Sequence, residues 1–181
     1  MKFQQIVALA TLISTALGSG ALAQDAQPTA NTLPTKPEKF KDWDLICPPP
    51  KEANGRRVCE IRTVILSDKG QKLGALVVAA IAGDPRGEVI ASALLPLGVD
   101  LTSEPTLEVE GKPMRLKYLR CLQRGCEALT ALSEGQQAAL RAGSIAKVGV
   151  GVGGGKTATF QFSLSGFSAA HDALKKRVAA R

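Results

Sequence analysis

Two cysteines separated by four residues, Cys121 and Cys126, bracket a tight turn between two β-like runs in residues 115–131. If a disulfide joins these cysteines across the hairpin, the two residue numbers of each facing pair add up to 247. Tyr118 then faces Leu129. Side chains alternate between the two faces of a strand, and most of the apolar ones then gather on one face. The predicted core face of the hairpin consists of Leu116, Tyr118, Leu129 and Ala131.

The chain contains four cysteines, and four cysteines in an exported protein allow three disulfide connectivities. Local pairing, Cys47 with Cys59 and Cys121 with Cys126, is predicted because both pairs flank turn-like segments. The alternative is a zinc site built from all four. Structural zinc sites draw on cysteines separated by two to four residues, whereas eleven residues separate Cys47 from Cys59. Disulfides are therefore the expected state, and no metal is predicted.

The start of the chain has the pattern of an export signal. Lys2 precedes an apolar run over residues 6–17, and Ala21-x-Ala23 follows as a cleavage pattern. Residues 1–23 are therefore predicted to be a secretory signal peptide. No later segment reaches about 18 uninterrupted apolar residues, so no transmembrane segment is predicted. The expected protein is exported and is periplasmic, associated with the outer surface, or secreted.

The chain beyond residue 23 is basic, because 22 Lys and Arg oppose 16 Asp and Glu, which leaves a net charge of +6. This charge suits a protein or an envelope component as partner, including a polyanionic one such as lipid headgroups or acidic glycans. Solubility alone explains the same charge. Nucleic acid is not an expected partner, because the cations are dispersed and few aromatic residues interleave with them.

Composition separates a linker from one folded domain. Residues 24–41 carry Pro28, Pro34 and Pro37 among polar residues and are predicted to be a flexible linker. Residues 42–181 are long enough for a single domain with its own core. Many short β-like runs separated by Gly and Pro turns predict a mostly all-β, β-sandwich-like domain of about 8–10 strands.

Two helices are expected within this β domain. Ser133 and Gln136 fit a capping box and Gly143 fits a helix stop, so one short helix is predicted over residues 133–142. A C-terminal helix is predicted to be capped by Ser168 and to pack one apolar side on the domain. The residues on that side are Phe167, Ala170, Leu174 and Val178.

The longest apolar run of the domain covers residues 72–82, and a second apolar run follows over 88–95. An almost unbroken apolar run is typical of a strand covered on both faces. The two strands are therefore predicted to form the centre of the sheets. The segment Leu95-Pro-Leu-Gly-Val99 then interrupts the pattern, as at a corner between sheets.

A glycine-rich segment imitates a nucleotide site. Gly149, Gly151 and Gly154 match G-x-G-x-x-G, and Gly155-Lys-Thr157 resembles the end of a phosphate loop. Both motifs require a helix after the glycines, so that its N-terminus meets phosphate. Here residues 158–164 alternate as in a strand. The segment is therefore predicted to be a glycine-rich β-turn, and no cofactor is expected.

Catalytic groups are sparse in this sequence. His171 is the one histidine, so a Ser-His-Asp or Cys-His enzyme would have to use it. Its neighbours place it at the edge of a packing helix, which predicts a structural or surface histidine. Glu108 and Glu110 share one side of a predicted strand, and paired carboxylates can act as acid and base. Beside a turn, such a pair is more typical of a solvated face. We expect no catalytic residue and no enzyme.

The order and spacing of several residues resemble one known family. These residues follow the predicted signal peptide over residues 42–174 and are Trp43-x3-Cys47, Cys59, Leu95-Pro-Leu-Gly-Val99, Cys121-x3-Gly125-Cys126 and Leu164-x-Gly-Phe-x2-Ala-x3-Leu174. Their pattern resembles the invasion-associated locus B family of exported bacterial proteins. That family is associated with attachment to or entry into host cells in some pathogens. The family is also present in bacteria that invade nothing, which implies an older envelope role. The family supplies no catalytic residues.

The resemblance implies a non-enzymatic envelope or surface binding module, with host-cell attachment or invasion as a special case. A periplasmic enzyme with an unrecognised site and a structural envelope-assembly protein are the alternatives. A binding module predicts an exposed apolar or basic patch without a deep polar pocket. An enzyme predicts a concave pocket around His171 or around Glu108 and Glu110, with perturbed acidities.

Overall fold

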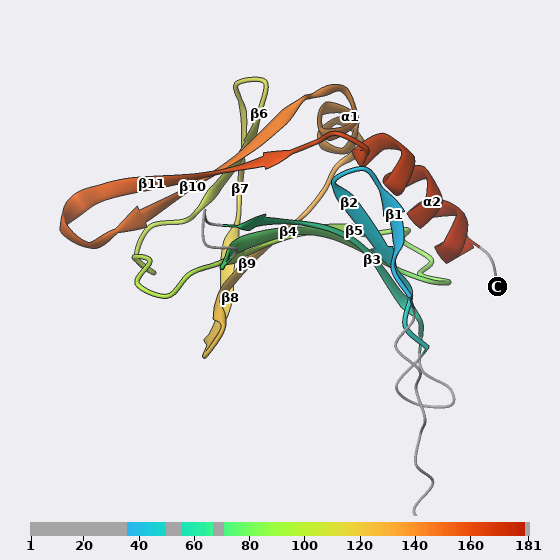
Figure 1. The fold of residues 1–181 in the computed structure, drawn as a ribbon, viewed down its shortest axis with the longest axis horizontal. Helices are drawn as coiled ribbons and strands as arrows, with labels where there is room; N and C mark the ends of the chain where they lie inside the picture. The colour runs from blue at the N-terminus through green and yellow to red at the C-terminus, as the bar shows by residue number, and fades with distance from the viewer. Residues whose placement is uncertain (1–35, 50–55, 67–70, 180–181) are drawn as a thin grey trace, which may run out of the picture. The chain divides into compact units, whose positions relative to one another are not determined.

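The computed structural model describes residues 36–49, 56–66 and 71–179 (Figure 1). The predicted signal peptide and residues 24–35 of the predicted linker lie outside these ranges. The described residues form two antiparallel sheets and two α-helices, α1 (Glu134–Ala142) and α2 (Phe167–Ala179). The prediction of a mostly β domain with one short helix and one C-terminal helix is confirmed.

One sheet has seven strands in the order β1-β2-β3-β4-β5-β9-β8, and the other has four in the order β11-β10-β6-β7. The described residues thus hold more strands than the 8–10 predicted. The strands are β1 (Glu38–Phe40), β2 (Trp43–Ile46), β3 (Val58–Leu66), β4 (Lys72–Ile81), β5 (Val89–Leu95), β6 (Thr106–Val109), β7 (Lys112–Arg115), β8 (Lys117–Leu122), β9 (Gly125–Ala131), β10 (Ile145–Val152) and β11 (Lys156–Ser163).

The chain passes between the two sheets at corners. It leaves the large sheet after Leu95, at the corner that the sequence predicts, and enters the small sheet at β6. It returns at Leu116, whose N–H donates to the carbonyl of Pro105 at 2.8 Å. The β-like run that precedes Cys121 in the sequence is thus divided at Leu116 between β7 of the small sheet and β8 of the large one. Part of the additional strand count arises from this division.

The core lies between one face of the large sheet, the small sheet and α2. We call this face of the large sheet its inner face. Figure 1 shows α2 beside the first strands of the large sheet, and its contacts are with β1 to β4. The ring of Trp43 packs edge-on against Phe167 with centroids 4.9 Å apart, and its Nε1 donates to the carbonyl of Ser163 at 3.0 Å. Other fully buried residues are Ile61, Leu76, Val78, Ala91, Leu107, Val148 and Leu174.

The ends of α1 follow the sequence prediction. The Ser133 hydroxyl accepts from the Gln136 N–H, the Gln136 side chain accepts from the Ser133 N–H, and Gly143 ends the helix. The prediction for α2 is wrong at its start. The helix begins at Phe167, and Ser168 lies within its first turn, where its hydroxyl donates to the carbonyl of Arg141 at 2.8 Å. Ser168 therefore ties α2 to α1 rather than capping α2.

Both disulfides in the structure are local, Cys47 with Cys59 and Cys121 with Cys126, as preferred from the sequence. The β2–β3 register pairs Ile46 with Glu60, and continuing it by one residue sets Cys47 opposite Cys59. Strand pairing thus brings the first two cysteines within disulfide distance of each other.

The predicted register of the β8–β9 hairpin is right near its turn and wrong beyond it. Cys121 faces Cys126, but Tyr118 faces Ala128 instead of Leu129. The cause is a β-bulge at Leu119, which adds one residue to β8. The buried face of β9 accordingly contains Ala128, while Leu129 is half-buried and Ala131 is exposed on the other face. Leu116 and Tyr118 do pack toward the core, as predicted.

The first described strand lies within the predicted linker. Strand β1 pairs antiparallel with β2, with Phe40 opposite Trp43 and Glu38 opposite Leu45. Glu38 also accepts from Arg177 of α2 at 3.0 Å. Backbone pairing and this ion pair explain order in a segment whose composition indicates a linker.

The glycine-rich segment forms the turn of the β10–β11 hairpin, as predicted. Gly154 and Gly155 adopt positive φ angles of 76° and 70° at the turn. Gly151 has a different role, because a Cβ there would lie 2.3 Å from the Ser103 hydroxyl. The absence of a side chain at this position lets the segment before β6 pass close over β10.

Candidate functional site

The second face of the large sheet is apolar along its centre, and we call it the open face. The core-facing residues of β4 include Leu76 and Val78, so Val77 and Ala79 point to the opposite side. Within the described ranges, α2 and the small sheet pack on the inner face. The apolar side chains of the open face include Val58, Val64, Ala75, Val77, Ala79, Ile81, Ile90, Leu94, Leu129 and Ala131.

Side chains of the open face keep considerable exposure although they lie in neighbouring strands. Val58 and Ile81 face each other and are 45% and 41% exposed. Val77, Ile90 and the other central residues are half-buried by their neighbours alone. An antiparallel sheet normally shows polar side chains on a face that meets water. The outer side of β4 departs from that rule and is a candidate binding surface.

The open face corrects one sequence prediction. The run over 72–82 predicts a strand covered on both faces, but the described chain covers β4 on one face only. The sequence shows how apolar each face of the strand is. An apolar face gives the same sequence pattern whether this chain or a partner protein packs against it. The discrepancy therefore identifies the surface for which the chain itself supplies no cover in the described ranges.

Charged side chains border the apolar centre on both sides. On the β3 side, Arg62 lies 3.8 Å from Glu60. On the β9 side, Glu127 accepts from Ser92 at 3.0 Å and pairs with Arg120 at 3.1 Å. Carboxylates match these two cations, whereas Lys117, which faces Leu129, adds an exposed cation, so the border carries charges of both signs with a small positive excess. An apolar centre with a polar rim is the usual anatomy of a protein–protein interface.

Glu108 and Glu110 do not lie on one strand, although the sequence places both on one side of a predicted strand. Glu108 lies on the outward side of β6, opposite Lys147 of β10. Glu110 is outside the strand, in the β6–β7 turn, where its φ is 48°. This turn ends at Gly111, because β7 begins at Lys112. Both glutamates line one shallow surface hollow with Lys147, which is consistent with a solvated face.

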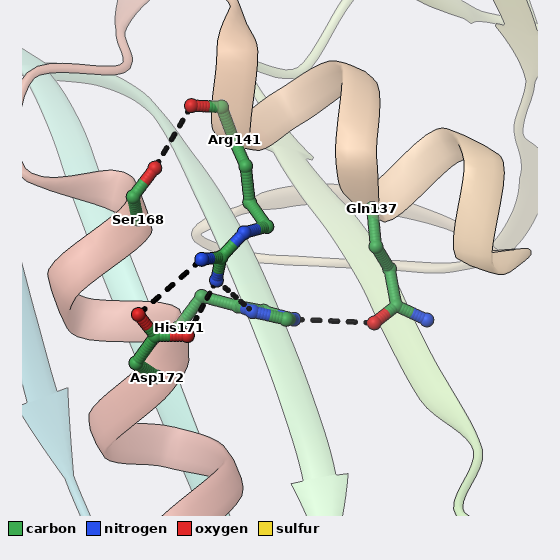
Figure 2. Close-up of polar contacts among 5 residues, drawn as sticks. All are labelled: Gln137, Arg141, Ser168, His171 and Asp172. Carbon is green, nitrogen blue, oxygen red and sulfur yellow. Dashed lines mark hydrogen bonds and ion pairs between the residues drawn. The ribbon is translucent and has the colours of Figure 1, made fainter.

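His171 is buried between the two helices and is 3% exposed (Figure 2). Its ring stacks on Phe167, with centroids 5.6 Å apart. Its Nε2 lies 3.2 Å from Gln137 Oε1, and its Nδ1 lies 3.2 Å from Arg141 Nη1. Arg141 in turn forms a bidentate pair with Asp172, at 2.6 and 3.3 Å. The sequence prediction of a structural histidine fits this packing.

The hydrogen bonds assign the neutral form of the imidazole. Gln137 Nε2 donates to the carbonyl of Leu132 at 3.1 Å, so its Oε1 is an acceptor and His171 Nε2 is the donor. Nδ1 then accepts from Arg141. Burial lowers the pKa of His171, and the cations Arg141 and Lys175 lower it further, against a smaller opposing effect of Asp172. Protonation of His171 Nδ1 would place its N–H against the N–H groups of the Arg141 guanidinium.

This arrangement predicts a pH-dependent stability. Because the pKa of His171 is lower in the folded chain, the unfolded chain binds more protons once the pH falls to the ordinary histidine value of about 6.5. The free energy of unfolding should therefore decrease as the pH falls from about 7 to about 5. A His171→Gln variant should lose this slope, whatever its stability at pH 7, as measured by urea unfolding at several pH values. An unchanged slope would contradict the assignment.

Within residues 36–49, 56–66 and 71–179, no group of three or more His, Cys, Asp or Glu side chains is placed to hold a metal ion. No described helix combines the length and the apolar character needed to cross a membrane.

A family model described as invasion-associated locus B protein matches residues 43–175. The chain belongs to this family. A crystal structure of invasion-associated protein B from Bartonella henselae is similar in fold, with a TM-score of 0.68 and 24% sequence identity. The match covers 78% of this chain and 95% of that one. No curated protein sequence matches significantly. The two disulfides together with membership of the locus B family indicate an extracytoplasmic protein.

Several residues that carry the locus B resemblance lie in the core or at close backbone contacts. Trp43, Phe167 and Leu174 are fully buried. Gly166 has a φ of 90°, and a Cβ there would lie 2.1 Å from the carbonyl oxygen of Phe40. These residues maintain the fold, and none of them lies on the open face. The family resemblance therefore could not locate the candidate surface.

Proposed function

We propose that the chain is a non-enzymatic binding module of the cell envelope, in the periplasm or at the outer surface, that holds a protein on its open face. The uncovered apolar side of β4 and β5 is the observation that carries this proposal. Covering apolar surface contributes about 25 cal/mol per Å², so several half-exposed aliphatic side chains supply a substantial part of a binding free energy. The border carries charges of both signs around an apolar centre, which favours a protein over a polyanion.

The names of the family and of the Bartonella protein associate those proteins with invasion. Host-cell attachment is the special case of this proposal in which the bound protein belongs to a host cell. The His171 and Glu108 neighbourhoods support a non-enzymatic role, since the first is packed between helices and the second faces solvent.

The proposal is tested by a charge placed in the centre of the open face. Ile90 has small neighbours across the strands, Ala79 and Ala131, so Ile90→Lys adds a cation without an adjacent like charge. Exported chain would serve as bait against solubilised envelope from its own cells at moderate salt. We expect the variant to retain about tenfold less of a specific protein partner, which corresponds to about 1.4 kcal/mol.

The matched control is Ile145→Lys. Ile145 is 39% exposed on β10 of the small sheet, so the same substitution adds the same charge away from the open face. The control should retain the partner at the wild-type level. Equal capture by wild type and Ile90→Lys, or capture of salt-sensitive polyanions alone, would contradict a protein-binding open face.

A further inference from the structure

The two sheets end in four edge strands, and one of them lacks protection against pairing. An edge strand presents unpaired N–H and C=O groups, and proteins usually shorten it, charge it or bulge it. β1 has three residues, and β7 has four, including Pro113. β8 contains the bulge at Leu119 and the exposed cations Lys117 and Arg120. β11 has eight residues, a continuous register with β10 and a single charged residue, Lys156, at its end.

The direction of the free backbone groups on β11 follows from its pairing. Leu164 N–H donates to the carbonyl of Ser144, so this pair exchanges hydrogen bonds, and every second residue of β11 before it does the same with β10. The residues between them point their N–H and C=O away from β10. The carbonyl of Ser163 fits this pattern, because it accepts from Trp43 Nε1. The remaining outward-pointing residues are Thr157, Thr159 and Gln161.

The side chains along this edge suit a second copy of the same chain. Thr157, Thr159 and Gln161 are exposed and uncharged. The whole chain carries a net charge of +7, so two copies repel each other. The repulsion is smaller where the approaching edge has few cations, which disfavours β8 with Lys117 and Arg120 and favours β11, whose one cation, Lys156, lies at its end.

We propose that β11 is a self-association edge, at which two copies pair their β11 strands antiparallel about a two-fold axis at Thr159. Thr159 then faces Thr159 of the second copy, and Thr157 faces Gln161. In this register each outward-pointing residue meets an outward-pointing residue of the second copy, so these three pairs exchange about six main-chain hydrogen bonds. On the core side, the half-buried Phe160 comes opposite Ala158 of the second copy. The interface is isologous, so it closes at a dimer.

Sedimentation velocity of the exported chain from about 10 µM to about 1 mM tests this proposal, since a single strand pair is a small interface and gives weak association. We expect the sedimentation coefficient to rise from that of a monomer toward that of a dimer. Thr159→Pro removes an outward N–H without removing a bond to β10, and Thr159→Lys places like charges at the axis. Both variants should stay monomeric throughout the range.

Ala138→Lys, on the exposed side of α1, is the control for added charge and should associate like the wild type. Thermal unfolding of each variant would show that the fold is retained. A wild type that stays monomeric up to about 1 mM, or variants at Thr159 that retain their fold and associate as the wild type does, would overturn the proposal. The assay involves no other protein, so its outcome is independent of the open face.

Discussion

Replacing Trp43 with alanine is expected to lower the free energy of unfolding by about 3–5 kcal/mol. The side chain is fully buried, packs against Phe167 of α2 and donates to the carbonyl of Ser163 on β11. It thereby joins the large sheet, the small sheet and the C-terminal helix. Its truncation leaves a cavity and an unpaired carbonyl in addition to the lost apolar burial.

Urea unfolding of the oxidised chain measures this effect. Leu119→Ala is the control, because Leu119 is 57% exposed on the bulged edge strand and its truncation should change the free energy of unfolding by less than about 0.5 kcal/mol. A loss below about 1 kcal/mol for Trp43→Ala would mean that α2 does not depend on this contact.

Removing the Cys47–Cys59 disulfide, by changing both residues to alanine, is expected to cost about 3 kcal/mol. On the chain-entropy model, the cost grows with the number of residues in the closed loop. The loop closed by Cys121 and Cys126 is shorter, since these residues are five apart in sequence instead of twelve, and its removal should cost about 2 kcal/mol.

The comparison is made by urea unfolding of the two double variants beside the wild type. Thiol titration of the denatured wild type should detect no free thiol, because the structure pairs all four cysteines. Free thiols in the exported wild type would contradict the pairing. A larger loss for the Cys121 and Cys126 variant would contradict the loop-length argument.

The parts of the fold that depend on local chemistry could be predicted from the sequence. The capping box at Ser133 and Gln136, the stop at Gly143 and the glycine-rich turn each need residues that are neighbours in the chain. The corner after Leu95 is similarly marked by Pro and Gly. The fold class followed from the number of such short runs.

The parts that depend on distant pairing could not be predicted. Alternation continues through Leu116, although the chain changes sheets there, so β7 and β8 look like one strand. The bulge at Leu119 has no sequence signal and moves Tyr118 opposite Ala128. The burial of His171 depends on where α1 crosses α2, which its own helix does not reveal.

The candidate surface was also only partly predictable from the sequence. The apolar run over 72–82 was visible, but the sequence could not show that one of its faces is left without cover in the described ranges. The family resemblance was carried by residues such as Trp43 and Phe167, which maintain the core. A sequence pattern that maintains a fold gives no information about the binding partner. The open face can be recognised only once the strands are placed side by side in the structure.

A photo-crosslinking amino acid at Val77 tests the central claim most directly, because it reports on whatever lies against the centre of the open face in living cells. Incorporation at Ile145 on the small sheet is the control. If the open face holds a protein, irradiation should give a discrete protein adduct at Val77 and none at Ile145. Equal incorporation with no adduct at Val77, or the same adducts at both positions, would contradict the account.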